Sequence, residues 1–255
     1  MCLILFAWKA HPDYPLILAA NRDEFHARPT LPAAWWHTSP DILAGRDLVG
    51  GGTWLGIDRT GRWAAVTNFR DPAREKSGRR SRGLLVHGFL AQRRDPAAYL
   101  AQVADAAPDF APFNLLAGDG REIGWYGSRK SSVELPEPGI HGLSNALLDT
   151  PWPKVADGKA ALAEQLRTGG PDPDALFALL ADRTPAADAR LPDTGVGLDW
   201  ERLLSARFIR SADYGTRCST LLLCDDQGLL TFRERRFAAD GSCQGEVAET
   251  FRLRR

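Results

Sequence analysis

The sequence lacks an excess of charge of either sign. Among its 255 residues, 32 Lys and Arg are balanced by 32 Asp and Glu, so the formal net charge is zero. Proteins that bind nucleic acid need a surplus of cations to displace the counterions of the phosphates, and we therefore expect no nucleic-acid partner. Long hydrophobic runs are also missing, because the longest, such as residues 3–8, fall far short of the roughly 20 residues that span a bilayer. We expect no membrane span.

Cysteine is scarce and follows no metal-binding pattern. The four cysteines, at positions 2, 218, 224 and 243, form no CxxC pair and no His/Cys cluster with zinc spacing. This spacing predicts neither a metal site nor a disulfide framework. The first residues also lack the basic stretch and the small-residue cleavage site of a secretory signal, so we expect a cytoplasmic protein.

What is present is the composition of a folded protein. Hydrophobic residues make up 44% of the chain and charged residues 25%, close to the averages for globular domains. Apolar runs separated by clusters of turn-forming residues predict antiparallel strands and hairpins. The expected strands are residues 3–8, 16–21, 53–57, 63–68, 115–117, 123–126, 219–225, 229–237 and 247–253.

Helices are expected between the strands, where apolar residues recur at helical spacing. Their expected ranges are 84–92, 96–106, 153–166, 174–181 and 201–207. Sheet at both ends of the chain, with helices grouped in two blocks, favours an α+β fold, and we expect one domain over residues 1–255. Pro, Gly and Asp are enriched at 184–199, which predicts a long surface excursion that is either a lid or a mobile insertion.

The first expected hairpin brings a cysteine close to a polar cluster. If its turn is centred near Pro12 or Asp13, the numbers of cross-strand partners sum to about 25, which places Cys2 opposite Asp23. Residues 21–24 at this open end read Asn-Arg-Asp-Glu and break abruptly from the apolar run before them. The alternative interpretation makes Cys2 a small buried hydrophobe and the polar run an ordinary exposed loop.

Cys2 carries the chemistry of an N-terminal nucleophile. Removal of the initiator Met, which is usual before a small residue, would leave Cys2 with a free α-amine whose pKa is about 7.7 to 8.0 in peptides. This amine can act as the base for the thiol of the same residue. Asp23 can hold the ammonium form, and Arg22 favours the thiolate. Retention of Met1 would remove the proposed base.

Five motifs occur in order along the chain. They are Cys2 with Asn-Arg-Asp-Glu at 21–24, Gly-Gly-Thr-Trp-Leu-Gly at 51–56, Thr-Asn-Phe-Arg at 67–70, Gly-Leu-Ser-Asn at 142–145 running into 148–154, and Tyr-Gly-Thr-Arg-Cys-Ser-Thr at 214–220. Together they resemble the NRDE family, also called the transport and Golgi organisation protein 2 family, over nearly the whole chain. The resemblance implies the N-terminal-nucleophile hydrolase fold, a four-layer αββα sandwich with two antiparallel sheets between helical layers.

Within that fold, the cysteine acylases that cleave penicillin V and conjugated bile salts supply a mechanistic template. The resemblance implies Cys2 as the nucleophile, with Asp23 or Arg22 as its polar partner. Those acylases place their arginine three residues before their aspartate. Here Arg22 directly precedes Asp23, so the register of the polar partner stays open.

The same template implies three further site residues. Asn68 and Asn145 would be amide donors near an oxyanion, where donors aimed at developing negative charge lower the barrier. Arg217 would be a charge that poises the site. The alternative interpretation gives each asparagine the role of capping its own loop and gives Arg217 a structural salt bridge with an Asp or Glu.

Two classes of function remain open. The first is a hydrolase of non-peptide amides or other acyl small molecules, which attacks through Cys2, forms an acyl-enzyme and requires no cofactor. The second is a non-catalytic binding or trafficking protein on the same scaffold. This alternative arises because the family that the chain resembles has been linked to heme movement and to acyl-lipid or coenzyme A metabolism. Heme is then the alternative ligand, and in both cases the partner is a small molecule.

A basic loop follows the expected strand that ends at Asn68. It holds Arg70, Arg74, Lys76, Arg79, Arg80 and Arg82. Arg79, Arg80 and Arg82 are expected either to meet an anionic ligand, such as heme propionates or phosphates, or to form a solvated loop. The five histidines form no spaced pair, so no axial heme ligand is assigned.

Overall fold

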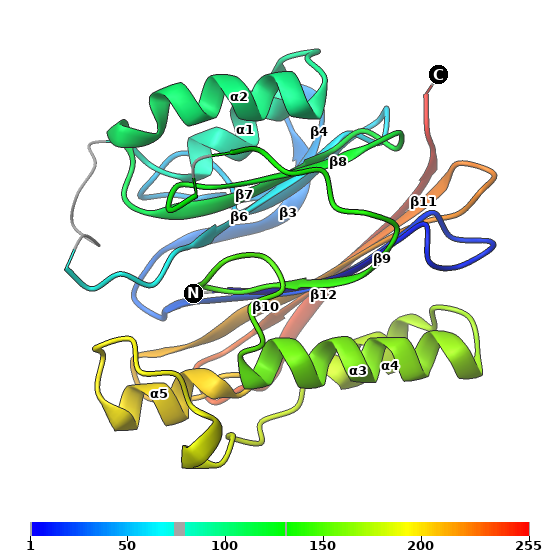
Figure 1. Ribbon diagram of the computed structural model, residues 1–255. Helices are drawn as coiled ribbons and strands as arrows, with labels where there is room; N and C mark the ends of the chain where they lie inside the picture. The colour runs from blue at the N-terminus through cyan, green and yellow to red at the C-terminus, as the bar shows by residue number, and fades with distance from the viewer. Residues whose placement is uncertain (1, 74–79, 131, 255) are drawn as a thin grey trace.

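The computed structural model describes residues 2–73, 80–130 and 132–254. Within these ranges the strands form two six-stranded antiparallel sheets that stack face to face (Figure 1). Helices cover the outer face of each sheet, so the layers follow the order helix, sheet, sheet, helix. This arrangement confirms the expected α+β sandwich of two antiparallel sheets between helical layers.

The first sheet contains the strand that begins at Cys2. Its strands lie in the order β12-β11-β10-β2-β1-β9. Their bounds are β1 Cys2–Trp8, β2 Leu16–Phe25, β9 Gly139–Leu143, β10 Tyr214–Cys224, β11 Leu229–Phe237 and β12 Cys243–Arg252. Three helices lie on its outer side, namely α3 (Pro153–Thr168), α4 (Pro173–Leu180) and α5 (Leu198–Ser205).

The second sheet follows the chain order without a crossover, β3-β4-β5-β6-β7-β8. Its bounds are β3 Thr30–Trp36, β4 Ser39–Asp47, β5 Leu55–Asp58, β6 Trp63–Asn68, β7 Phe113–Gly118 and β8 Ile123–Gly127. The outer face is covered by α1 (Gly83–Ala91) and α2 (Pro96–Ala106), and a short 3₁₀ turn follows at Ala107–Asp109. None of the helices in the described ranges is long and apolar enough to cross a membrane.

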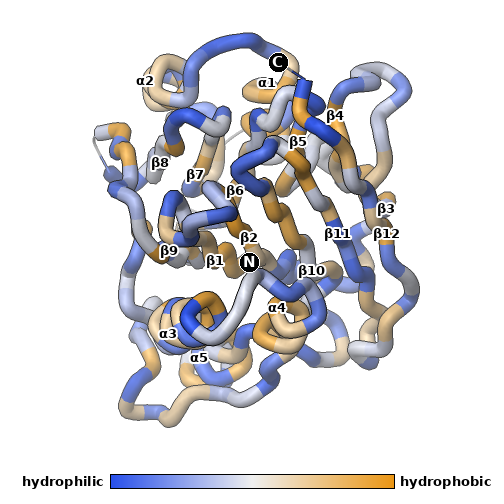
Figure 2. Tube along the Cα trace, turned by 90° about the vertical axis from the view of Figure 1, so that its right-hand side faces the viewer, coloured by the Kyte–Doolittle hydropathy of each residue, from blue (hydrophilic) through white to orange (hydrophobic). Residues whose placement is uncertain are grey.

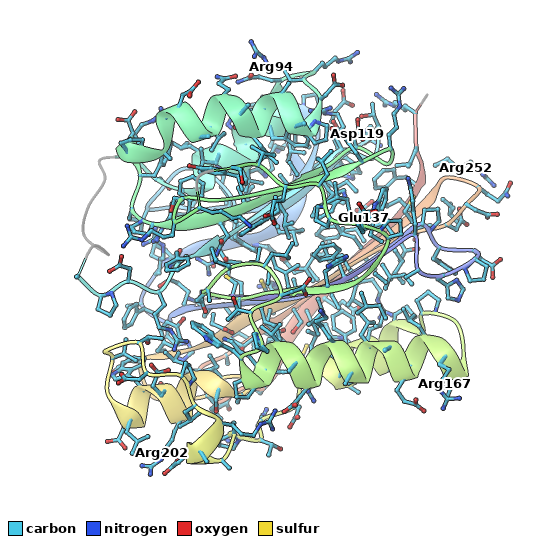
Figure 3. All side chains as sticks on the ribbon, in the orientation of Figure 1. Arg94, Asp119, Glu137, Arg167, Arg202 and Arg252 are labelled. Atoms are coloured by element: carbon cyan, nitrogen blue, oxygen red, sulfur yellow. The ribbon has the colours of Figure 1, made fainter. Side chains whose placement is uncertain are left out.

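β1 is buried on both of its faces. Ile4 and Phe6 belong to the core between the sheets, whereas Leu3 and Leu5 pack into the core beneath α3 and α4. Successive side chains of a strand point to opposite faces, so a strand covered on both sides reads as an unbroken apolar run. This explains the continuous hydrophobic stretch at 3–8, which Figure 2 shows within the apolar centre of the molecule. Side chains fill the space between the layers (Figure 3).

All the strands and helices predicted from the sequence are present, with ends that differ by a few residues. Three strands were not predicted, namely β3, β4 and β9. Proline cannot donate a ladder hydrogen bond, and β3 contains Pro32 while β4 contains Pro40, so neither segment has the pattern of a strand. β9 is only five residues long and two of them are glycine.

The segment between α4 and α5 is a surface excursion, as its composition suggested. It contains one short 3₁₀ turn at Asp188–Arg190. Arg190 joins the segment to α3 through an ion pair with Asp157, whose Nη2–Oδ1 distance is 2.6 Å. Thr194 joins it to α5, because its backbone N–H and its hydroxyl both donate to Glu201.

Candidate active site

The structure pairs Cys2 with Arg22 across β1 and β2, so the expected pairing with Asp23 is wrong by one residue. The hairpin loop closes where Lys9 N–H donates to the carbonyl of Pro15, 2.8 Å away, and this closure fixes the register. Directly opposed residues of an antiparallel pair point to the same face, so Cys2 and Arg22 share the face that meets the second sheet. The side chain of Asp23 is on the other face, toward the helices.

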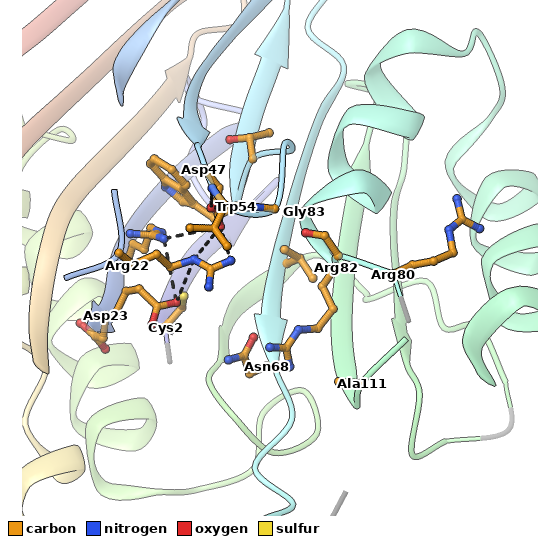
Figure 4. A pocket seen from close by; sticks show the side chains of 17 residues that line it. Cys2, Arg22, Asp23, Asp47, Trp54, Asn68, Arg80, Arg82, Gly83 and Ala111 are labelled. Atoms are coloured by element: carbon orange, nitrogen blue, oxygen red, sulfur yellow. Dashed lines mark hydrogen bonds and ion pairs between the residues drawn. The ribbon is translucent and has the colours of Figure 1, made fainter. Parts of the chain in front are cut away.

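A cavity of about 390 Å³ opens beside Cys2. Figure 4 shows it between the start of β1, the end of β6 and the segment that leads into α1. Its size lies within the range of about 300 to 1,000 Å³ that small-molecule sites occupy. The residues that the sequence assigned to the site and that line this cavity are Cys2, Arg22, Asp23, Asn68, Arg80 and Arg82.

Arg22 is almost completely buried and packs against an aromatic ring. The central carbon of its guanidinium group lies 4.4 Å from the ring centroid of Trp54, and the side chain is 5% exposed. Its Nη2 lies 3.9 Å from Glu24 and 4.0 Å from Asp47. Its Nη1 is buried and makes no hydrogen bond within the part of the chain that the structure describes. Arg22 therefore places a desolvated positive charge at the cavity wall beside Cys2.

The surroundings of Cys2 oppose formation of the thiolate. Burial is the main cause and raises the pKa of the Cys2 thiol, and the nearby Asp23 carboxylate raises it further. Arg22 and a hydrogen bond from the backbone of Asp23 act in the opposite direction and lower that pKa. A thiol in this environment reacts at neutral pH only if a base removes its proton as the new bond forms. Met1, whose removal would expose the α-amine as that base, lies outside the described residues.

Asp23 is fixed by β10. Its side chain is 1% exposed, and the hydroxyl of Thr216 donates to Oδ1 at 2.7 Å. The same hydroxyl accepts the backbone N–H of Ile209 at 2.9 Å, so the orientation of Thr216 is set on both sides. Burial raises the pKa of Asp23, and the Lys154 ammonium is the largest opposing influence.

The two asparagines have different positions. Asn68 ends β6 and lines the cavity. Asn145 is completely buried, and its Nδ2 donates to the carbonyl oxygen of Asn68 at 2.9 Å. The backbone N–H of Arg70 donates to the carbonyl of Asn145 at 2.7 Å. Asn145 therefore holds the backbone after β6 in place. Of the two asparagines that were expected beside the oxyanion, Asn68 is the one that lines the cavity.

Arg217 lines a neighbouring pocket, which shares Arg22 and Trp54 with the cavity beside Cys2. It occupies a bulge between the β10 residues that pair with β2 on either side of it. Its Nη1 donates to the carbonyl oxygens of Phe25 at 2.9 Å and Arg28 at 3.1 Å. These partners are backbone carbonyls and not the Asp or Glu of the alternative interpretation, whereas the expected role of Arg217 as a charge that poises the site stays a prediction. Arg217 holds the loop that follows the Asn-Arg-Asp-Glu run.

The basic loop is only partly described, because Arg74, Lys76 and Arg79 lie outside the described residues. Arg80 and Arg82 line the cavity, and Arg82 also donates to the carbonyl of Pro112 at 3.1 Å. Arg70 is instead a buried structural residue. Its Nη1 lies 2.5 Å from Glu201 Oε2, and its guanidinium stacks on Trp152 at 4.5 Å.

Several residues near Cys2 were not assigned from the sequence. Trp54 and Lys154 lie inside motifs that carried the resemblance, which was the available signal for both. Asp47 also lines the cavity. Its carboxylate accepts hydrogen bonds from Arg28 Nε and from the backbone N–H groups of residues 49 and 50, and these bonds fix the turn at one side of the cavity. Glu201 lies far along the sequence in α5, and no local pattern connects it to Cys2.

Among the described residues no three His, Cys, Asp or Glu side chains gather so as to hold a metal ion.

The stacked sheets, their helical covers and a cysteine at the start of β1 define the class of N-terminal-nucleophile hydrolase folds. A Caenorhabditis elegans N-acylethanolamine-hydrolyzing acid amidase ortholog superimposes with a TM-score of 0.53 at 9% identity, covering 87% of this chain and 92% of that one. A mutant conjugated bile acid hydrolase from Clostridium perfringens gives 0.50 at 9% identity, covering 100% and 97%. At such identities the likeness establishes the fold.

Sequence comparison defines the family within this class. The family described as Transport and Golgi organisation 2 matches residues 1–239, and the chain belongs to it. The Bos taurus Transport and Golgi organization protein 2 homolog is 39% identical over 99% of both chains. The Homo sapiens homolog is 38% identical over 92% of each, and the Drosophila melanogaster protein is 27% identical over 92% of this chain and 91% of that one. The resemblance seen in the five motifs is confirmed.

Proposed function

We propose that this chain is an N-terminal-cysteine amidohydrolase that acts on a non-peptide amide or acyl small molecule. The observation that carries the proposal is the position of the Cys2 thiol. The thiol lies at the wall of a cavity of small-molecule size. The cross-strand partner of Cys2 is Arg22, whose guanidinium is buried, and the residue that follows Arg22 is Asp23, whose carboxylate is also buried. A cysteine that served only as a packing residue would not need this concentration of buried charge, which is costly to desolvate.

The reaction begins once Met1 has been removed. The neutral α-amine of Cys2 accepts the thiol proton while Sγ attacks the carbonyl carbon of the substrate. The tetrahedral oxyanion collapses, the C–N bond breaks, and the leaving amine takes the proton from the α-ammonium group. Water then attacks the thioester with the α-amine again as base, which releases the carboxylic acid and regenerates the thiol. Bonds and protons balance without a cofactor.

Two residues are suited to stabilise charge in this reaction. Asn68 lines the cavity, and we propose that it donates to the oxyanion, while Asn145 fixes its backbone. Arg22 faces the same space with a buried N–H group, so it favours a negative charge on sulfur or on the oxyanion. In this proposal Arg217 acts only through the loop at 25–28.

The structural neighbours support the reaction class. One is named for hydrolysis of N-acylethanolamines and the other for hydrolysis of conjugated bile acids. Both names describe hydrolysis of an acyl compound or a conjugated acid, and the proposal takes from them only this general type of substrate. The identity of the acyl group is left to experiment.

The test is detection of an acyl-enzyme on Cys2. The purified protein is incubated with N-acylethanolamines and with acyl conjugates of glycine and taurine, and intact mass and released acid are measured. We expect loss of Met1, a transient mass increase on the peptide that begins with Cys2, and no turnover by Cys2→Ala. Cys224→Ala is the matched control, because Cys224 lies at the other end of the first sheet. Retention of Met1 in the mature protein, or turnover by Cys2→Ala, would falsify the proposal.

A second candidate function is binding of an anionic ligand without catalysis. Arg28, Arg80 and Arg82 line the same cavity as Cys2, and they offer donors for heme propionates or for the phosphates of an acyl-coenzyme A. No histidine is among the lining residues of the described chain, so these contacts would come from the arginines. A binding protein should keep its affinity in Cys2→Ala and lose it in Arg80→Ala with Arg82→Ala. Titration with heme and with palmitoyl-coenzyme A, followed by absorbance and calorimetry, distinguishes the two functions.

A further inference from the structure

A lysine is buried behind the Cys2 site, on the helix side of the first sheet. Lys154 is the second residue of α3 and is only 3% exposed. Its Nζ makes no hydrogen bond within the described ranges. Lysine is almost never buried without a partner, because removing an ammonium group from water is costly. The position of Lys154 therefore calls for a specific compensating charge.

Ionisable groups from four other elements influence the pKa of this ammonium. They are Cys2 of β1, Asp23 of β2, Arg70 after β6 and Glu201 of α5. The Arg70 and Glu201 side chains are paired with each other at 2.5 Å, and these two residues and Lys154 line a void of about 10 Å³. With Arg70 and Glu201 neutralised as a pair, Asp23 is the main negative charge that answers Lys154.

The electrostatic influence is mutual. Burial lowers the pKa of Lys154 to about 8, and Asp23 is the largest influence that raises it again. In turn, burial raises the pKa of Asp23, and Lys154 is the largest influence that lowers it. Tyr214 of β10 also faces Asp23 and Cys2 and is neutral at physiological pH, because burial raises its pKa well above the ordinary value.

We infer that Lys154 is a positioning residue of the Cys2 site, whose ammonium group keeps the Asp23 carboxylate ionised beneath the nucleophile. The inference rests on the proposed function in that the Cys2 thiol and α-amine are the reacting groups. An ionised Asp23 orients the α-ammonium formed when the amine takes the thiol proton. A protonated Asp23 would not hold that charge. Lys154 makes no hydrogen bond to a reacting atom of the described residues and acts through Asp23.

The test follows the protonation of Asp23 directly. Infrared difference spectra across a pH titration report the C=O stretch of a protonated carboxyl group, and subtraction of the Asp23→Asn spectra assigns the Asp23 band. In Lys154→Met and Lys154→Gln we expect the midpoint of this band to rise by about one to three pH units, the effect of losing a neighbouring opposite charge. Lys159→Met is the matched control on the same helix, since Lys159 is paired with Asp149.

Turnover gives the second measurement. Both Lys154 variants should lower kcat more than they change KM, because substrate contacts in the cavity are intact. Methionine and glutamine are chemically different replacements. If one of the two variants does not fold, the Asp23 midpoint and the turnover are measured on the other. An unchanged Asp23 midpoint in a folded Lys154 variant overturns the inference, even if the wild type is a hydrolase. A raised midpoint in a protein that turns over no amide supports the inference and counts against the proposed function.

Discussion

Cys2 and Arg22 occupy directly opposed positions in neighbouring antiparallel strands. Their side chains share one face of the first sheet, and Cys218 flanks Arg22 on its other side through the pairing of β10 with β2. Two cysteines therefore lie in one row across three strands, with a guanidinium group between them. Of these two cysteines, Cys2 lines the cavity of about 390 Å³, whereas Cys218 lines the neighbouring pocket that also contains Arg217.

The two cysteines of this row should react at very different rates. Burial raises the pKa of Cys218 well above the ordinary value, and its side chain is 4% exposed. We expect iodoacetamide to label Cys2 at least about tenfold faster than Cys218, which should react only on unfolding. Peptide mass spectrometry measures both rates, and exposed Cys243 is the internal reference. Equal rates at the two positions would mean that the cavity does not expose Cys2.

Asn145 should matter for stability. Asn145 is buried, and Asn145→Ala removes both the donor to the part-buried carbonyl of Asn68 and the acceptor of the Ser144 hydroxyl. We expect a loss of about 1 to 3 kcal/mol in the free energy of unfolding, measured by urea denaturation.

The comparison variant is Asn68→Ala, whose side chain lines the cavity. Its expected effect is the opposite pattern, with stability nearly unchanged and turnover reduced about 10²- to 10³-fold. If Asn68→Ala destabilised the fold as much as Asn145→Ala while turnover persisted, the division of roles between them would be refuted.

The Arg70–Glu201 pair should be essential for stability. Both side chains are 5% exposed, and Glu201→Ala removes the carboxylate partner of the buried Arg70 guanidinium. Breaking one partner of a buried pair costs about 3 to 5 kcal/mol, which denaturation midpoints would record. The adjacent Arg202→Ala removes an exposed pair with Asp188 and should leave the midpoint unchanged. Equal midpoints for the two variants would contradict this prediction.

Stability should depend on pH through His141 and Asp149. The hydrogen bond between His141 Nδ1 and Asp149 is 2.7 Å long and raises the pKa of His141 above 6.5. A raised folded-state pKa means that this stabilisation is present below 6.5 and is lost as pH rises through the folded value. The pKa of Asp149 is lowered to about 2, mainly by hydrogen bonds to His141 and Lys159 that outweigh the opposing effect of burial, so its contribution is lost only as pH falls from 3.8 toward that value.

His141→Gln should therefore remove the fall in unfolding free energy on the alkaline side of 6.5. Urea denaturation at a series of pH values measures this slope. His37→Gln changes an exposed histidine and should keep the slope of the wild type. A His141→Gln protein with the wild-type slope would show that another group controls it.

The sequence predicted much of the fold because local patterns matched local structure. The apolar run at 3–8 is a strand covered on both faces, and Asp-Arg-Thr-Gly at 58–61 forms the turn between β5 and β6, where Gly61 has a φ of 86°. The patterns failed at β3 and β4, which pair with each other as neighbours in the sequence, because Pro32 and Pro40 interrupt their strand patterns.

The candidate site was predicted in part for the same reason. Cys2, Arg22 and Asp23 belong to one hairpin, so short-range geometry brought them together to within one residue of the true register. The roles of Asn145 and Arg217 depend on which backbone carbonyls lie beside them, and a sequence does not contain that information. Lys154 reaches the site only because α3 packs against β1, which is a relationship between segments more than a hundred residues apart.

The location of Cys2 has a practical consequence for protein production. Cys2 lines the cavity, and a purification tag or fusion partner attached ahead of it would block release of the α-amine. The far end of the described chain follows β12 and lies well away from this opening (Figure 1). Recombinant material intended for assays should therefore carry any tag at its carboxyl end, and negative results obtained with an amino-terminal tag would not be informative.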